Sequence, residues 1–123
     1  METNKGVETL YARDRQVWRE WLEVNGQSKN EICLIMYHKK SDTQSINHEE
    51  AVEEAMCFGW IDSLRNKRNH ESFYQRFSPR KPRSNWSERS KETARSMIKA
   101  GLMTQEGLKV IEVAKKNGKW ESK

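Results

Sequence analysis

The stretch Cys57–Ser63 reads Cys-Phe-Gly-Trp-Ile-Asp-Ser, and it marks the point where a helix changes to a strand. Gly59 suits the residue that follows a helix, because glycine readily adopts the left-handed backbone found at helix ends. Beyond it, the runs at residues 60–68 and 72–80 predict two strands joined by a polar turn. We therefore expect a β-hairpin that directly follows a helix.

The residues before this stretch predict a third strand and two helices. The unbroken apolar run Ile32–Tyr37 is typical of a central strand that is buried on both faces. Asp14 is the expected cap of a helix that runs to about residue 24, where apolar residues recur at helical spacing. Asn47 and Glu50 predict the capping box of the helix that ends at Gly59.

Downstream of the hairpin, Ser87 and Thr104 are the expected caps of two further helices. Trp120 is expected to fold back onto the core, to which we also assign Trp18 and Trp21. The elements together predict an α+β fold, in which one small domain has the order α-β-α-β-β-α-α and a three-stranded, largely antiparallel sheet packs against helices. We expect a loose N-terminal segment at residues 1–10, the domain at 11–120 and a tail at 121–123.

The composition predicts a folded domain with an aromatic core and a polar surface. Only 34% of the 123 residues are apolar and 33% are charged, yet five are Trp, which buries a large area. The net charge is +5, and residues 65–91 hold nine basic and two acidic side chains. Such a patch attracts anionic partners; the alternative is a solvated basic hairpin with no partner.

Other features limit the class of protein. Cys33 and Cys57 lie in apolar runs, so we expect buried, reduced thiols. No apolar run approaches the ~18 residues of a membrane span, and residues 1–6 lack the apolar core of a signal peptide, so we expect a cytoplasmic protein. The three His have no metal-ligand spacing, and no nucleotide-binding fingerprint occurs, so neither a metal nor a cofactor is expected.

Aromatic, basic and small polar side chains gather in the hairpin and in the turn after it. Asp62 follows two large apolar residues and needs a partner, which Arg76 or Arg80 on the neighbouring strand could supply. Guanidinium groups suit bidentate contact with phosphate or carboxylate. The candidate ligand-binding residues are Trp60, Asp62, Arg76, Arg80, Lys81, Ser84, Asn85 and Trp86.

Each of these residues also has a purely structural interpretation. Asp62 would form a salt bridge that joins the two strands. Ser84 and Asn85 would build a turn before the third helix. Trp60 and Trp86 would be core residues rather than stacking platforms beside a ligand.

Several longer blocks of the chain resemble a known family. They include the helix-to-strand stretch and the blocks Trp18–Glu23, Tyr37–Lys40, Glu49–Asp62, Arg76–Arg80, Ser84–Ser87, Gly101–Thr104 and Ala114–Trp120. On these blocks the chain is similar to the YdeI/OmpD-associated, or bacteriocin-protection, family of small bacterial proteins. The resemblance implies a role in tolerance of bacteriocins or cationic antimicrobial peptides, and it implies no catalytic residue, cofactor or substrate.

The chain departs from the pattern of that family at several positions. Cys33 stands where Trp is usual, Ser63 where Gly is common and Asn69 where Asp is frequent. Many relatives continue beyond the block that ends at Trp120 into another helical segment. If that segment normally completes the site, we expect part of the function to be absent here.

Three functions are compatible with these patterns. The first is a binding module, rather than an enzyme, that takes a small anionic ligand or an acidic segment of a partner protein in the Trp/Arg/Asp cleft. The second is single-stranded nucleic-acid binding through the basic hairpin at residues 65–91, since aromatic residues interleaved with Arg favour single strands. The third is an enzyme that uses Asp62 as a base beside an Arg-bound anion.

Overall fold

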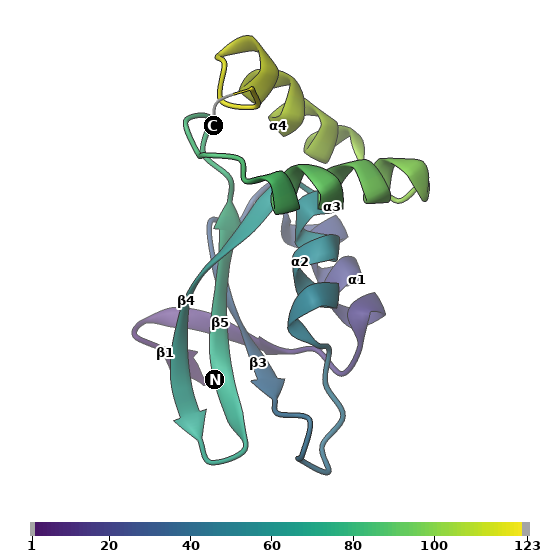
Figure 1. The fold of residues 1–123 in the computed structure, drawn as a ribbon. Helices are drawn as coiled ribbons and strands as arrows, with labels where there is room; N and C mark the ends of the chain where they lie inside the picture. The colour runs from purple at the N-terminus through teal and green to yellow at the C-terminus, as the bar shows by residue number, and fades with distance from the viewer. Residues whose placement is uncertain (1, 122–123) are drawn as a thin grey trace.

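The computed structural model describes residues 2–121, which form a small α+β domain of strands and helices in the order ββαβαββαα (Figure 1). The strands are β1 (Thr3–Asn4), β2 (Val7–Tyr11), β3 (Ile32–Tyr37), β4 (Trp60–Asn69) and β5 (Ser72–Pro79). The helices are α1 (Arg15–Asn25), α2 (His48–Cys57), α3 (Glu88–Lys99) and α4 (Gln105–Lys116). Residue 1 and residues 122–123 of the predicted tail lie outside the described residues.

The strands form one mixed sheet in the order β1-β2-β3-β5-β4. Strands β2 and β3 are parallel, and every other neighbouring pair is antiparallel. The predicted central strand, β3, is confirmed, but the prediction of three strands was wrong because the segment at residues 1–10, expected to be loose, contributes β1 and most of β2. Strand β1 has two residues and β2 has no buried residue, so neither has the local pattern of a strand.

The four helix starts agree with the predicted caps. The side chains of Asp14, Asn47, Ser87 and Thr104 each accept a hydrogen bond from the backbone amide three residues further on. Glu50 reaches back to the amide of Asn47 and completes the capping box of α2. These bonds satisfy amides that a helix leaves unpaired at its N-terminus.

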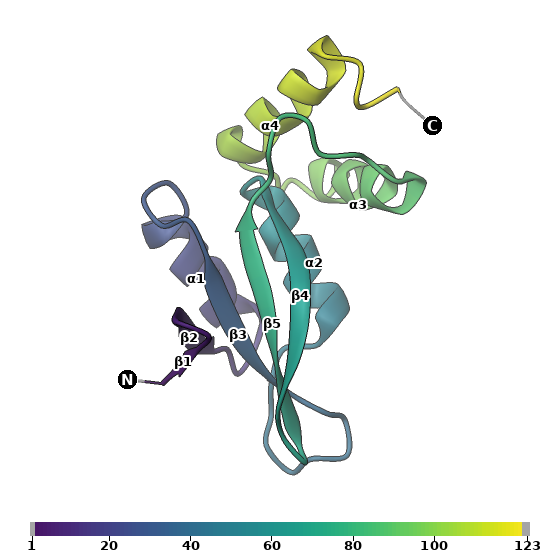
Figure 2. The same cartoon turned by 90° about the vertical axis from the view of Figure 1, so that its left-hand side faces the viewer.

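The helices occupy two positions around the sheet. Helices α1 and α2 pack on one face, whereas α3 and α4 lie at the end of the sheet where β4 begins and β5 finishes (Figures 1 and 2). On the other face, the end of β1 approaches β3, with Asn4 Nδ2 lying 3.7 Å from Cys33 Sγ.

The core has two clusters that correspond to this arrangement. The larger one lies between the sheet and α1 and α2, and it contains Trp18, Leu34 and Phe77. The smaller one lies under α3 and α4, and its buried members are Met56, Trp86, Ala94, Ile111, Ala114 and Trp120. Trp120 therefore folds onto the core as predicted, and both cysteines are buried free thiols.

Candidate anion-binding site

A pocket of about 290 Å³ opens where the end of the sheet meets α4. Four segments that are far apart in sequence form its wall: the loop after α1, the turn between α2 and β4, the end of β5 and the start of α4. We name it the Arg80 pocket; its lining residues are Gly26, Gln27, Lys29, Asn30, Phe58, Gly59, Trp60, Pro79, Arg80, Glu106, Lys109 and Val110. Three cationic side chains and one carboxylate give this lining a positive charge.

Arg80 is the buried cation of the pocket, since only 7% of the residue is exposed. Its backbone amide donates to the carbonyl of Gly59 at 2.8 Å, which continues the pairing of β5 with the start of β4. The centre of its guanidinium lies 3.9 Å from the ring centroid of Trp86. The side chain is therefore held in place by stacking and by its own backbone.

The guanidinium of Arg80 has unused hydrogen-bonding capacity. Within the described part of the chain, Nη1 donates a hydrogen bond to the carbonyl of Asn85 at 3.0 Å. The Nε atom is buried and has no partner in that part of the chain. A buried donor left unpaired costs about 1–3 kcal/mol, so an anion that pairs with this group would recover free energy.

Burial also weakens the charged form of this arginine. It lowers the pKa of Arg80 to about 10, and the charge of Asp62 opposes this shift without cancelling it. A guanidinium that is both desolvated and short of partners differs from a surface arginine, which water satisfies. Groups of this kind gather at functional sites, although ion pairs in a structural role perturb pKa values as well.

Close backbone packing fixes the walls around Arg80. Thr104 donates a hydrogen bond from Oγ1 to the carbonyl of Cys57 at 2.5 Å, which ties the start of α4 to the end of α2. On the opposite wall, the indole of Trp60 donates to the carbonyl of Gly26 at 3.0 Å and ties β4 to the end of α1. The pocket is thus largely formed without a ligand, as small-molecule sites commonly are.

The structure brings part of the predicted site together. Trp60 and Arg80 both line the pocket, whereas Asn85 and Trp86 contact the Arg80 guanidinium without lining the pocket themselves. Both indoles are buried, Trp60 being 2% and Trp86 5% exposed. Trp60 therefore forms part of the pocket wall, and Trp86 supports the guanidinium of Arg80.

The other predicted residues lie outside the pocket. Arg76 pairs with Glu31, with Nη2 at 2.8 Å from the carboxylate, rather than with Asp62. Asp62 lies 3.3 Å from the ring of His48, and its charge acts on Arg80 without a close ion pair.

Lys81 and Ser84 also belong to a structural feature rather than to the pocket lining. The amide of Ser84 donates to the carbonyl of Lys81 at 3.0 Å, so these residues form the turn after β5. The side chain of Ser87 bonds to the amide of Ser90 and serves as the cap of α3.

Sequence reasoning missed the polar residues from the other two segments. Lys29 follows α1, and Glu106 and Lys109 lie on the first turns of α4. Charged residues at such positions are common on any protein surface, so no local pattern distinguishes them. The packing of α4 against the turn at Gly59 brings Glu106 and Lys109 to the pocket. The bond from Trp60 to Gly26 holds the loop that carries Lys29.

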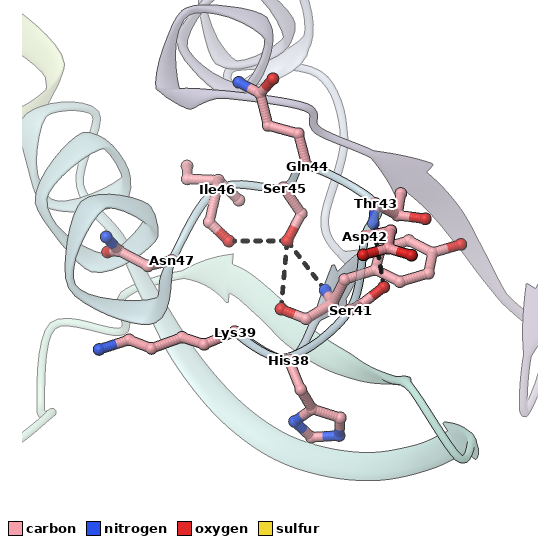
Figure 3. Close-up of a pocket in the computed structure, with 10 residues that line it drawn as sticks. His38, Lys39, Ser41, Asp42, Thr43, Gln44, Ser45, Ile46 and Asn47 are labelled. Atoms are coloured by element: carbon pink, nitrogen blue, oxygen red, sulfur yellow. Dashed lines mark hydrogen bonds between the residues drawn. The ribbon is translucent and has the colours of Figure 1, made fainter.

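A second hollow, of about 260 Å³, lies inside the loop that joins β3 to α2 (Figure 3). Ser45 holds the loop together, since its hydroxyl accepts from the amide of Tyr37 at 2.9 Å and lies near the carbonyls of Tyr37 and Ile46. His38 and Lys39 point away from Ser45 in Figure 3. Among residues 2–121, the buried polar atom without a partner belongs to Arg80 and not to any residue that lines this hollow.

Within residues 2–121, no three His, Cys, Asp or Glu side chains are grouped so that they could hold a metal ion. No helix in the same range is long and apolar enough to cross a membrane.

The fold and the pocket define a small α+β domain with a basic pocket at one end of its sheet. The profile of one family, described as Domain of unknown function (DUF8412), matches residues 10–110. The chain belongs to this family, and the match spans all four segments that line the Arg80 pocket. Comparisons with curated proteins and with solved structures give no match.

Proposed function

We propose that this domain is a binding module that holds a small anion in the Arg80 pocket. The observation that supports it most is the buried guanidinium of Arg80, whose Nε has no partner among the described residues. Lys29 and Lys109 add positive charge at the rim, and the Gln27 and Asn30 amides offer neutral donors. Phosphates and carboxylates are the anions that guanidinium groups bind best.

The size of the pocket favours a small ligand. Its volume of about 290 Å³ lies just below the roughly 300–1,000 Å³ of typical small-molecule sites. Inorganic phosphate, a small carboxylate or a sugar phosphate fits this class better than a long polymer. Glu106 on the lining would exclude anions that approach it closely or would bind a hydroxyl or ammonium group of the ligand.

The experiment is a panel of thermal shifts followed by calorimetry. Phosphate, sugar phosphates, nucleotides and small carboxylates are tested against the purified domain at low and high salt. In Arg80→Met, which keeps much of the side-chain volume over Trp86, the affinity of an identified ligand should fall at least about tenfold.

Lys81→Ala is the matched control, because Lys81 is the adjacent cation but does not line the pocket. Its affinity should stay close to that of the wild type. The proposal is wrong if no anion of the panel binds, or if Arg80→Met and Lys81→Ala reduce affinity equally. Circular dichroism of both variants separates loss of binding from loss of folding.

The other functions that the sequence suggested have less support and stay predictions. For nucleic-acid binding, both candidate stacking rings, Trp60 and Trp86, are buried, and Arg68 and Arg76 are already paired with carboxylates. For an enzyme, Asp62 lies beside His48 on the surface rather than in the pocket. The resemblance to the YdeI/OmpD-associated family, with its link to bacteriocin tolerance, also stays a prediction.

A further inference from the structure

Arg68, which lies near the end of β4 and beside the start of β5, binds a carboxylate of the protein itself. Arg68 Nε lies 2.7 Å from Glu2 Oε2, and Arg68 Nη2 lies 3.1 Å from Glu2 Oε1. The hydroxyl of Tyr74 donates to the same Oε2 atom. Two parallel bonds from one guanidinium to both oxygens of a carboxylate are the geometry by which arginine recognises carboxylates. We call Arg68 and Tyr74 the carboxylate clamp.

The sheet orients the clamp through contacts that do not involve Glu2. Arg68 Nη1 donates to the hydroxyl of Ser72 at 3.1 Å and lies 3.3 Å from that of Tyr37. Ser72 is fully buried and donates in turn to the side chain of Asn69 at 2.8 Å. Strands β3, β4 and β5 therefore hold the guanidinium with its Nε–Nη2 edge toward the solvent side where Glu2 binds. The clamp is a preorganised site for a carboxylate.

Outside the clamp, the segment that carries Glu2 is held by the two-residue strand β1, by the contact of Asn4 with Cys33 and by one bond to the Glu2 carbonyl. Strand β1 consists of Thr3 and Asn4, which pair with Val7 and Glu8 at the edge of the sheet. Beyond this pairing, the carbonyl of Glu2 accepts a hydrogen bond from Thr9 Oγ1 at 2.8 Å. If β1 moved away, the edge of β2 would offer unpaired backbone groups to another extended segment.

We propose that the clamp is a recognition site for an acidic, extended peptide segment, and that Glu2 occupies it as an internal substitute. The incoming segment would pair with β2 in place of β1 and would put its Glu or Asp side chain between Arg68 and Tyr74. Arg65 and Lys67 are exposed on the same strand as Arg68, but they pair with Gln75 and Phe73, whose side chains face away from Tyr74. They raise the positive charge of the strand without touching the clamp. Addition of a strand to a free sheet edge is a common way to bind peptides.

The chemistry of Glu2 is consistent with a site that strongly prefers an ionised carboxylate. Hydrogen bonds from Arg68 and then from Tyr74 lower the pKa of Glu2 to about 2. The hydrogen bond that Tyr74 donates to Glu2 raises the pKa of Tyr74 in turn. A carboxylate from another molecule would gain the same bonds.

The internal Glu2 competes with any such partner. A group tethered through a short segment acts at an effective concentration in the millimolar range, so a weakly binding peptide is excluded from the intact protein. Removal of the Glu2 carboxylate should therefore open the clamp, and it should also loosen β1 from the edge of β2, because Glu2 ties the start of β1 to Arg68 and Tyr74. This makes Glu2→Ala the variant in which binding becomes measurable.

The test is an NMR titration of the ¹⁵N-labelled protein of residues 1–123. The probe is an acetylated peptide with the sequence of residues 2–6, Glu-Thr-Asn-Lys-Gly. Its addition to Glu2→Ala should shift the Nε–H signal of Arg68, with a Kd at least about tenfold lower than for the wild type. The same peptide with Glu2→Gln should produce no such shift.

Two further variants locate the site. Adding Arg68→Gln to Glu2→Ala should weaken binding at least about tenfold, whereas adding Arg65→Gln, a neighbouring cation outside the clamp, should change it by less than about threefold. Each of three results would overturn the proposal. They are equal affinity for wild type and Glu2→Ala, equal binding of the two peptides, and no shift of the Arg68 signal. If Arg68→Gln fails to fold, the comparison of the two peptides on Glu2→Ala still decides the question.

Discussion

Gly59 has two separate reasons to be glycine. Its φ is +77°, a left-handed conformation that costs a side-chain residue about 1–2 kcal/mol. In addition, a Cβ at this position would lie 2.6 Å from Val110 Cγ2 and 3.3 Å from the carbonyl oxygen of Glu106. The side chain of Val110 is stiff at χ1, and the Glu106 oxygen belongs to the backbone of α4, so neither neighbour moves aside easily. The turn at Gly59 thus allows α4 to approach and form one wall of the pocket.

Gly101 provides the control for a substitution at Gly59. Its φ of +76° is nearly the same, but a Cβ there would meet nothing within 4 Å. Gly59→Ala should lower the free energy of unfolding by about 3 kcal/mol and Gly101→Ala by about 1 kcal/mol, because only the first adds a steric conflict. Urea unfolding measures both values. Equal losses would mean that backbone strain alone explains Gly59, and that contact with α4 does not matter.

Single residues also show where sequence reasoning about the site succeeds and where it stops. Trp60 and Arg80 could be predicted because they lie in one hairpin, whose alternation and register bring them to the same end. The prediction that Asp62 pairs with Arg76 or Arg80 failed for a physical reason. Glu31 pairs with Arg76, and His48 lies against Asp62. Both partners come from other segments, and no strand pattern reveals them.

Helix α4 depends on one hydroxyl at its start. Thr104 Oγ1 accepts from the amide of Gly107 as the helix cap and donates to the carbonyl of Cys57, which joins α4 to α2. Thr104→Val keeps the shape of the side chain and removes both bonds, so it should cost about 2–3 kcal/mol. It should also weaken binding of an identified anion, since α4 supplies Glu106 and Lys109 to the pocket.

Ser87→Ala is the matched control at the start of α3. Its hydroxyl caps the helix by accepting from the amide of Ser90, but the residue is exposed and makes no comparable bond to α2. The expected loss is about 1 kcal/mol, with little change in anion affinity. Urea unfolding and calorimetry of the two variants check this, and the interpretation of α4 is wrong if both variants behave alike.

Elements differ in how much of their structure is encoded locally. All four helices could be predicted with their caps, because a cap and an apolar stripe are short-range patterns. Strand β2 could not, because its five residues Val-Glu-Thr-Leu-Tyr become a strand through parallel pairing with β3, more than twenty residues away. Strand β1 exists only as the partner of β2, so the order of the sheet was beyond local reasoning.

At the scale of the whole molecule, a stack of side chains joins the pocket to the end of the described chain. The guanidinium of Arg80 lies over Trp86, and the Trp86 and Trp120 rings are 5.0 Å apart between centroids. Lys91 holds this end in place, since its Nζ donates to the carbonyl of Trp120 at 3.1 Å. The second core cluster therefore supports the group that we expect to bind the anion.

This arrangement predicts that Trp120→Ala affects both stability and binding. Loss of a buried Trp should cost about 3–5 kcal/mol, which a domain with a stability of 5–15 kcal/mol can survive at low temperature. Because Trp86 would lose its neighbour, Arg80 would lose its fixed position, and the affinity for an identified anion should fall several-fold. Phe73→Ala is the control: Phe73 is 8% exposed, close to the 7% of Trp120, but it belongs to the larger cluster. The stability of Phe73→Ala should fall by a comparable amount, while its affinity for the anion stays unchanged. Calorimetry well below the melting temperature measures the affinity. Equal affinities in the two variants would show that the stack does not position Arg80.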